Sequence, residues 1–281
     1  MNSGWSGPNF FLVGAAKSGT TAFASALRAH PDVFLPAVKE PHYYAYLADP
    51  VSARKVYADE AEAHRRYHDL YADVGDEVAV GDASTTSLVV PGAAAAIAHD
   101  VPDARIVAVL RHPVDRAFSN WCHFVAAGGE TLDFAEAVRV EPERQALGVA
   151  FTYQYLGWGR YAGQLRPFFE LFGHNRVLVH LHDDLVADGE AVMRSTFRFL
   201  GVDDTVSRPP VARENEVRAV RFRSVKGRPG RLVRRATPDR WRNQPKPRLD
   251  PALRARLTKD EFAGEIDELE ELLGRDLSAW R

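Results

Sequence analysis

Five consecutive residues near the start of the chain combine a cation, hydroxyl groups and a glycine. They are Lys17, Ser18, Gly19, Thr20 and Thr21, and they follow the apolar run 10–13 (FFLV) and Gly14. This order predicts a buried strand, a tight turn and the first turn of a helix. Backbone N–H groups at a helix start, with an ammonium group beside them, bind phosphate or sulfate. The stretch therefore predicts an anion site with Lys17 at its lip, although an ordinary turn with a solvated lysine would use the same residues.

A second pair of anion-binding groups follows the clearest buried strand, residues 106–110 (IVAVL). Arg111 stands at the end of that strand, and Ser119 lies on the helix that Pro113 is well suited to begin. Because parallel strands place their carboxyl ends at one edge of a sheet, we expect Lys17 and Arg111 to face a common ligand. Two separated anion sites indicate a nucleoside that carries phosphates at both ends.

An enzyme that uses a nucleoside triphosphate is the main alternative, and the spacing of the loop tests it. A Walker A loop reads G-x-x-x-x-G-K-[ST], with its lysine directly after the second glycine. Here Gly14 and Gly19 have the right separation, but the lysine precedes Gly19. Asp82, after a weak strand, is the nearest counterpart of a Walker B carboxylate. A kinase-like phosphotransferase is thus disfavoured but stays open, as does a non-catalytic protein that binds nucleotides or polyanions.

The two motifs resemble those of sulfotransferases that use 3′-phosphoadenosine 5′-phosphosulfate (PAPS). Residues 17–21 are similar to the 5′-phosphosulfate loop of that family, and residues 111–119 (RHPVDRAFS) to its 3′-phosphate motif. The resemblance implies a P-loop-like site in which residues 18–21 cradle the 5′-phosphate and Lys17 stabilises the departing oxygen. It also implies that PAPS is the donor, that 3′,5′-diphosphoadenosine is the product and that no metal takes part. The other donor-binding residues that it implies are Arg111, Ser119, Lys226, Gly227 and Arg228.

The loop 38–44 (VKEPHYY) is most similar to the heparan-sulfate type of this family, in which a glutamate before an aromatic pair is the catalytic base. The resemblance assigns that role to Glu40, which would accept the proton of a hydroxyl acceptor. Lys39, His42 and Tyr43 are expected to contact that acceptor, a small molecule or a glycan. Two simpler readings stay open, because Glu40 could pair with Lys39 or cap a turn, and His42 is an alternative base.

Strand and helix patterns alternate along the chain, which predicts a single α/β domain over residues 1–281 around a mostly parallel sheet flanked by helices. The polar segment 51–73 offers a packing face. Loop 82–86 departs from the Ser-Pro sequence that is commoner at this loop in the family that the chain resembles. We expect strands at 33–35, 78–80, 106–110 and 177–181, helices at 22–30, 93–99, 161–172 and 188–200, irregular structure at 128–160, a basic loop or flap at 208–248 and a C-terminal helical segment at 251–281.

Composition excludes several other classes. A net charge of −2 over 281 residues gives no reason to expect nucleic acid as a partner. Cys122 is the only cysteine, so neither an internal disulfide nor a cysteine-based zinc cluster is possible. His180 and His182 alternate on a strand without a third placed ligand, which favours core and capping roles over a metal. No apolar run is long enough to span a bilayer, and we expect a cytoplasmic, soluble enzyme.

Overall fold

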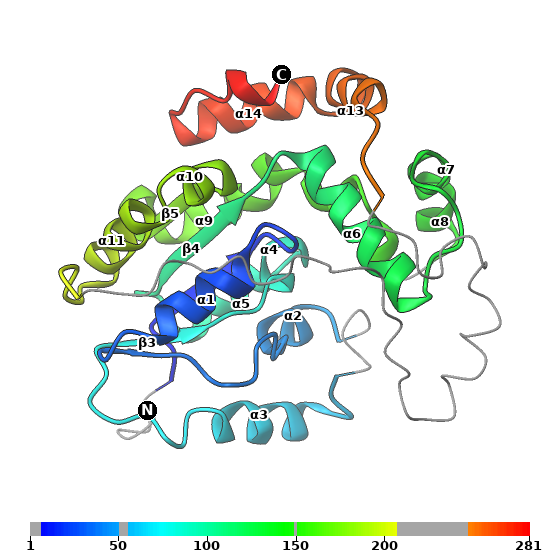
Figure 1. Cartoon of the computed structure of the whole chain (residues 1–281). Coiled ribbons are helices and arrows are strands. Elements are labelled where there is room, and N and C mark those ends of the chain that lie inside the picture. The colour runs from blue at the N-terminus through cyan, green and yellow to red at the C-terminus, as the bar shows by residue number, and fades with distance from the viewer. Residues whose placement is uncertain (1–6, 51–55, 149–150, 207–246) are drawn as a thin grey trace. The chain divides into compact units, whose positions relative to one another are not determined.

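The computed structural model of the chain describes residues 7–50, 56–148, 151–206 and 247–281 (Figure 1). These residues belong to two compact units. The first unit lies within Met1–Arg111 and Tyr161–Glu214, and the second within His112–Arg160 and Asn215–Arg281. The predicted motif of Lys226, Gly227 and Arg228 falls outside the described residues.

The described part of the first unit contains a five-stranded parallel sheet in the order β2-β3-β1-β4-β5. Every residue of β1 and β3 is buried, as expected for strands covered on both faces. The predicted α/β class, with a parallel sheet flanked by helices, is confirmed. The strands are β1 (Phe10–Gly14), β2 (Val33–Phe34), β3 (Ala79–Asp82), β4 (Arg105–Leu110) and β5 (Val177–Leu181).

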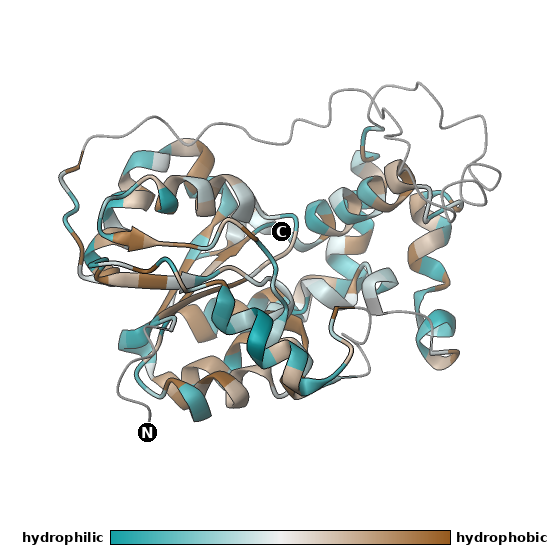
Figure 2. Cartoon of the chain, turned by 90° about the horizontal axis from the view of Figure 1, so that it is seen from below, coloured by the Kyte–Doolittle hydropathy of each residue, from teal (hydrophilic) through white to brown (hydrophobic). Residues whose placement is uncertain are grey.

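Helices cover the two faces of this sheet because alternate strand residues point to opposite sides. On one face, Phe10 and Leu12 of β1 share a buried core with Phe23 of α1 (Thr20–Arg28) and Phe197 of α11 (Gly189–Leu200). Figure 2 shows the apolar residues gathered along the strands and hydrophilic residues on the outer helices. The opposite face is covered by α4 (Thr86–Val89), α5 (Ala93–Asp100) and α9 (Tyr161–Phe172).

The direction of chain crossover changes between β1 and β4, which are neighbours in the sheet. The helix after β1, α1, packs on one face, whereas α9, which precedes β5, packs on the other. In open α/β sheets, ligands bind outside the carboxyl ends of the strands at such a switch point. The loops that follow β1 and β4 are therefore the expected ligand-binding loops, and they begin at Ala15 and Arg111.

A tyrosine cluster fixes the helices beside β2 and β3. The ring of Tyr67 stacks on Tyr43 with centroids 3.9 Å apart, and its hydroxyl donates to Asp82 Oδ2 at 2.8 Å. Tyr71 donates to the carbonyl of Gly81. These contacts confirm the packing face predicted within residues 51–73. The helices involved are α2 (Tyr43–Ala48) and α3 (Glu60–Asp69).

The described part of the second unit is helical, and it corrects one prediction. Residues 128–160 are not mainly irregular, because two helices of six residues each form there, and Asp133 caps the first by accepting from the N–H of Glu136 at 2.9 Å. The first unit likewise gains the unpredicted helix α10 (His182–Ala187). The helices of the second unit are α6 (Pro113–Ala127), α7 (Phe134–Arg139), α8 (Glu141–Ala146), α13 (Pro251–Leu257), the π-helical turn Thr258–Phe262 and α14 (Ala263–Leu273).

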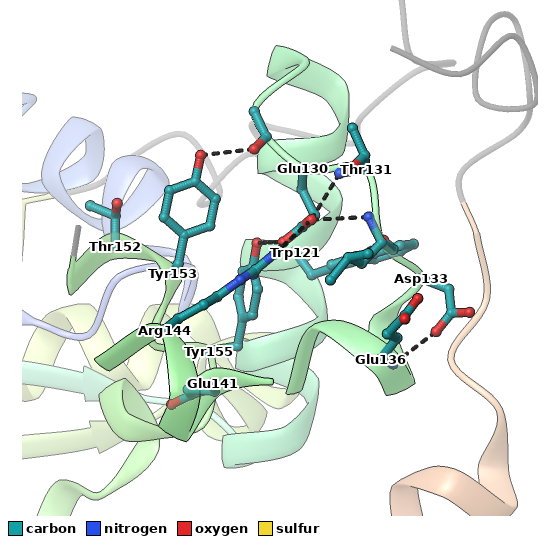
Figure 3. Close-up of polar contacts among 12 residues, drawn as sticks. Trp121, Glu130, Thr131, Asp133, Glu136, Glu141, Arg144, Thr152, Tyr153 and Tyr155 are labelled. Atoms are coloured by element: carbon teal, nitrogen blue, oxygen red, sulfur yellow. Dashed lines mark hydrogen bonds and ion pairs between the residues drawn. The ribbon is translucent and has the colours of Figure 1, made fainter. Parts of the chain in front are cut away.

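A buried carboxylate holds the middle of the second unit together. Glu130 is 2% exposed, and its oxygens accept from Arg144 Nη1 at 2.7 Å and from the hydroxyl of Tyr155 at 2.9 Å. They also accept from the N–H groups of Thr131 and Leu132 at 2.8 and 3.0 Å (Figure 3). Burial alone would raise the pKa of Glu130, but these hydrogen bonds hold that pKa below its ordinary value.

The end of the chain is tied to the start of α6. His112 Nε2 donates to the carbonyl of Trp280 at 2.9 Å, and Arg254 donates to both carboxylate oxygens of Asp115 at 2.9 and 3.1 Å. Gly274 ends α14 with a φ of 59°, the left-handed conformation that is common for a glycine after a helix. Cys122 is buried on α6 and is not part of a disulfide. None of the helices in the described ranges combines the length and the apolar character needed to cross a bilayer.

Candidate functional site

The turn between β1 and α1 exposes the start of a helix. Gly19 occupies the N-cap position with a φ of 88°, and the first bond of the helix runs from the N–H of Phe23 to the carbonyl of Gly19 at 3.1 Å. The N–H groups of Thr20 and Thr21 precede that bond and have no acceptor within the helix. The N–H of Ser18, in contrast, donates to the carbonyl of Ala15 at 3.2 Å. Within the predicted phosphate cradle at 18–21, the N–H groups of Thr20 and Thr21 are therefore the ones that the helix leaves without an acceptor.

The side chains of this loop have different environments. Lys17 is half-buried with a φ of 70°, and Thr21 is exposed. The side chain of Ser18 is fully buried, and its Oγ has no hydrogen-bond partner among the described residues. A buried hydroxyl without a partner is costly, and a bound ligand is one way to satisfy it. The loop therefore combines a cation, open N–H groups and an unsatisfied hydroxyl.

Arg111 lies beside this loop. Its Nη1 is 3.4 Å from the carbonyl oxygen of Lys17, and its own carbonyl accepts from the hydroxyl of Tyr161 at 2.9 Å. Tyr161 is fully buried, so this bond attaches the end of β4 to α9. Trp158, shortly before α9 in the chain, is also buried. The structure thus brings Lys17 and Arg111 together at the switch point.

Ser119 belongs to the second unit, where it is half-buried on α6. The residues between Arg111 and Ser119 serve the packing of that unit. Arg116 is fully buried and donates to the carbonyl of Tyr155, as expected for an internal partner rather than a ligand contact. Its charge also favours the ionised form of the buried Glu141.

The carboxylate of Glu40 lies in a dense set of contacts after β2. Lys39 Nζ bonds Oε1, the N–H of Thr85 donates to Oε2 at 2.7 Å, and Thr85 Oγ1 donates to Oε1 and Oε2 at 3.0 and 3.1 Å. The side chain of Glu40 is 26% exposed, so the carboxylate is held by partners but not closed off. The Lys39–Glu40 pair that the sequence left open is present.

His42 lies next to this carboxylate. Its Nδ1 is 3.9 Å from Glu40 Oε2 and hydrogen-bonds with Thr86 Oγ1 at 2.8 Å. Burial lowers the pKa of His42, Glu40 opposes that shift and Lys39 adds to it. The imidazole is therefore the neutral form near pH 7 and does not add a positive charge to this loop.

Tyr43, a predicted acceptor contact, is buried in the structure. It is 3% exposed, and its hydroxyl hydrogen-bonds with His64 Nδ1 at 2.6 Å. Burial raises the pKa of Tyr43, with smaller contributions from Asp100 and Glu60. Its place in the tyrosine cluster gives it a packing role, and its contact with an acceptor stays a prediction from the sequence.

Asp82 is the last residue of β3. The loop that follows it contacts residues 38–44, which carry Glu40 and are called the Glu40 loop. The residue is buried, and burial raises its pKa to about 6, although hydrogen bonds from Ser84 and Tyr67 oppose that shift. A Walker B aspartate coordinates magnesium through water and stays ionised. Asp82 is instead held by a tyrosine hydroxyl within the fold, and the described residues contain no cluster of His, Cys, Asp or Glu that could bind a metal.

Comparison with known proteins decides the family. The sequence profile of the sulfotransferase family matches residues 8–206. The chain belongs to the sulfotransferase family. A crystal structure of a sulfotransferase from Alicyclobacillus acidocaldarius shares 33% sequence identity with it, covers 98% of each chain and superposes with a TM-score of 0.78. The resemblance that the two motifs indicated is confirmed.

Several curated relatives of this chain are named for carbohydrates. Human carbohydrate sulfotransferase 15 is 24% identical over 246 residues, which cover 69% of this chain and 44% of that protein. Mouse heparan sulfate glucosamine 3-O-sulfotransferase 3A1 is 25% identical over 198 residues, covering 69% of this chain and 46% of that protein. The chain thus spans less than half the length of these two relatives.

Two features of the sulfotransferase site were missed in the sequence. Loop 82–86 holds the Glu40 loop, and its run of three hydroxyl residues after a strand was the available signal. His182 of α10 lies close to the Lys17 loop, residues 17–21. A Cβ atom added to Gly19 would be 3.3 Å from Cδ2 of His182. For His182 the sequence favoured core and capping roles over a metal, and the helix that places this residue was not predicted.

Proposed function

We propose that the protein transfers the sulfuryl group of PAPS to a hydroxyl acceptor. The observation that carries this proposal is the contact between Arg111 and the Lys17 loop at the switch point. It joins a guanidinium to a loop with a lysine, open N–H groups and the unsatisfied Ser18 hydroxyl. These groups suit a donor that carries separate phosphates, because a guanidinium binds phosphate in a forked geometry and a helix start binds a second anion.

The proposed transfer is an in-line displacement at sulfur. The acceptor oxygen forms a bond to sulfur while the bond from sulfur to the 5′-phosphate oxygen breaks. The acceptor proton goes to the Glu40 carboxylate, and Lys17 stabilises the charge that develops on the departing oxygen. Such a step depends on positioning and on fixed positive charge, as phosphoryl transfer does. The proposed products are a sulfate ester and 3′,5′-diphosphoadenosine.

The acceptor that we propose is a sugar hydroxyl. The names of the curated relatives support this class, since they specify carbohydrate and heparan sulfate glucosamine acceptors. Lys39, His42 and Tyr43 of the Glu40 loop stay the predicted contacts of that acceptor. Ser119 and the motif of Lys226, Gly227 and Arg228 stay predicted donor contacts from the sequence.

Glu40→Gln tests the enzymatic role directly. We expect transfer of labelled sulfate from PAPS to fall by roughly 100-fold or more, in the range seen for loss of a general base. Affinity for 3′,5′-diphosphoadenosine, measured by calorimetry, should survive because the donor groups are untouched. Glu60→Gln, at a side chain that is 73% exposed, is the matched control and should keep full turnover. Equal loss of binding and turnover would contradict the assignment of Glu40.

The kinase alternative has a separate test. Family membership does not favour it, and it predicts transfer from ATP that stops when EDTA removes magnesium. The present proposal predicts transfer from PAPS that EDTA leaves unchanged. Activity with ATP and none with PAPS would overturn the proposed donor.

A further inference from the structure

Three consecutive residues after β3 each hold one group of the Glu40 loop. The Oγ of Ser84 accepts from the N–H of His42 at 3.2 Å, and Thr86 Oγ1 hydrogen-bonds with the imidazole of His42 at 2.8 Å. Between them, Thr85 bonds the Glu40 carboxylate through both its N–H and its hydroxyl. The N–H of Glu40 itself donates to the carbonyl of Ala83 at 3.1 Å. Loop 82–86 thus fixes the conformation of the loop that carries Glu40 through hydrogen bonds.

The backbone of the Glu40 loop needs hydrogen bonds of this kind to keep its conformation. Glu40 and His42 both have left-handed backbone conformations, with φ of 62° and 59°, and neither is a glycine. Each residue in that region costs about 1–3 kcal/mol and persists only where surrounding contacts hold it. The bonds from Ala83, Ser84 and Thr85 are contacts of that kind. This loop is therefore shaped by its partners rather than by its own local preference.

We infer that Thr85 is the positioning residue for Glu40. The inference rests on the proposed function, in which Glu40 accepts the acceptor's proton. Thr85 is 5% exposed, so its side chain has a fixed place in the fold. Its N–H orients Oε2, and its hydroxyl reaches both carboxylate oxygens. A carboxylate has about four lone-pair sites, and the hydroxyl of Thr85 has one proton to donate, so the three donors (this hydroxyl, the N–H of Thr85 and Lys39) leave a site that can accept a further proton.

The threonine hydroxyl has a property that a backbone N–H lacks. It can donate to the ionised carboxylate and accept from the protonated one, because a hydroxyl is both donor and acceptor. The same side chain thus holds Glu40 before and after the proton arrives. A valine at this place keeps the branched shape and removes only the hydroxyl, and a serine keeps the hydroxyl and removes the methyl group.

Thr85→Val and Thr85→Ser are the informative pair. We expect kcat to fall roughly 10- to 100-fold in the valine variant, the range for loss of one hydrogen bond to a charged group. The KM for PAPS and the affinity for 3′,5′-diphosphoadenosine should stay within about twofold, since the N–H and the hydroxyl of Thr85 bond Glu40 and, within the described residues, no donor-binding residue. The acidic limb of the pH–rate profile should move to higher pH, because the ionised carboxylate loses a donor.

A rescue variant and a control variant show whether a fall in kcat comes from loss of the Thr85 hydroxyl. Thr85→Ser should recover most of the activity and the original pH profile, whereas Thr205→Val, at an exposed threonine, should change neither. If Thr85→Val does not fold, Thr85→Ala removes the same hydroxyl without placing a methyl group against the carboxylate. Wild-type kcat and pH profile in a folded valine or alanine variant would overturn the inference, as would a serine variant as impaired as valine. Glu40→Gln distinguishes failure of the proposed function from failure of this inference. An active Glu40→Gln enzyme would overturn the proposed function. An inactive Glu40→Gln enzyme together with a normal Thr85→Val enzyme would overturn only the role of Thr85.

Discussion

Arg111 Nη1 lies 3.4 Å from the carbonyl oxygen of Lys17, at the ends of two neighbouring strands. The guanidinium therefore contributes to the shape of the lysine loop as well as to its charge. Tyr161 fixes Arg111 from the other side by donating to its carbonyl at 2.9 Å. This relationship links the two sequence motifs physically and leads to the first prediction.

Replacing Arg111 with lysine should weaken one phosphate site selectively. We expect the affinity for 3′,5′-diphosphoadenosine to fall roughly 10- to 100-fold, because lysine cannot reproduce the forked contact of a guanidinium. Adenosine 5′-phosphate, which lacks the 3′-phosphate, should lose much less. Calorimetry with both ligands checks this, with Arg139→Lys at an exposed position of α7 as control. An equal loss for both ligands would mean that Arg111 acts only on the shape of the loop.

Gly19→Ala should destabilise the fold, and Gly163→Ala should stabilise it. Gly19 has a φ of 88° and a Cβ there would approach His182, so we expect a loss of about 1–2 kcal/mol. Gly163 lies inside α9, where an added Cβ meets open space, so alanine should gain about 0.5–1 kcal/mol. Urea unfolding measures both changes. The same sign for both variants would contradict the assigned loop geometry.

Asp82→Asn should remove a pH dependence of stability. The pKa of Asp82 is raised from 3.8 to about 6 by burial, so the folded state holds a proton that the unfolded state has already released. The wild type therefore loses stability as pH rises through that interval, by roughly 3 kcal/mol in all. The asparagine variant keeps an acceptor for Tyr67 and has no charge to bury. Denaturant unfolding at pH 4.5 and pH 7 should show a smaller decrease for Asp82→Asn than for the wild type.

The control for this experiment is Asp69→Asn, at an exposed aspartate that ends α3. Its pH dependence should match that of the wild type. If Asp82→Asn also follows the wild type across the same interval, Asp82 is not the group that titrates there.

Glu130→Gln should destabilise the second unit strongly. It removes the charge of the buried Glu130 and leaves the half-buried Arg144 guanidinium without its anionic partner, and loss of one member of such a pair costs up to about 3–5 kcal/mol. Glu136→Gln, at a surface pair with Arg139 3.9 Å away, should change stability by less than about 0.5 kcal/mol. Chemical denaturation measures both. Because the pKa of Glu130 is lowered, its contribution is present at neutral pH and is lost as pH falls through that pKa, so the two variants should converge in acid.

Local patterns in the sequence predicted most of the sheet-bearing unit. The strand at 177–181 and the helix at 161–172 have the predicted bounds, because apolar runs and helical periodicity are properties of neighbouring residues. The approach of Lys17 and Arg111 was also predictable, because every parallel strand places its carboxyl end at the same edge.

The errors arise where long-range contacts determine structure. Residues 128–160 lack a continuous apolar stripe, and their two short helices depend on the buried Glu130, whose partners Arg144 and Tyr155 are distant in sequence. The capping pair of Asp133 and Glu136 was the signal that could have indicated the first of these helices. The Thr85–Glu40 contact joins residues 45 positions apart, and no spacing rule predicts it.

The left-handed backbone at Lys17, Glu40 and His42 has an evolutionary consequence. Glycine adopts this conformation without a steric penalty, so a library randomised at these positions and selected only for heat resistance should enrich glycine or asparagine there. A selection that also demands sulfate transfer should retain glutamate at position 40 and lysine at position 17. The two enrichment profiles should therefore diverge at these three positions, and the divergence would show where the protein gives up thermal robustness for turnover.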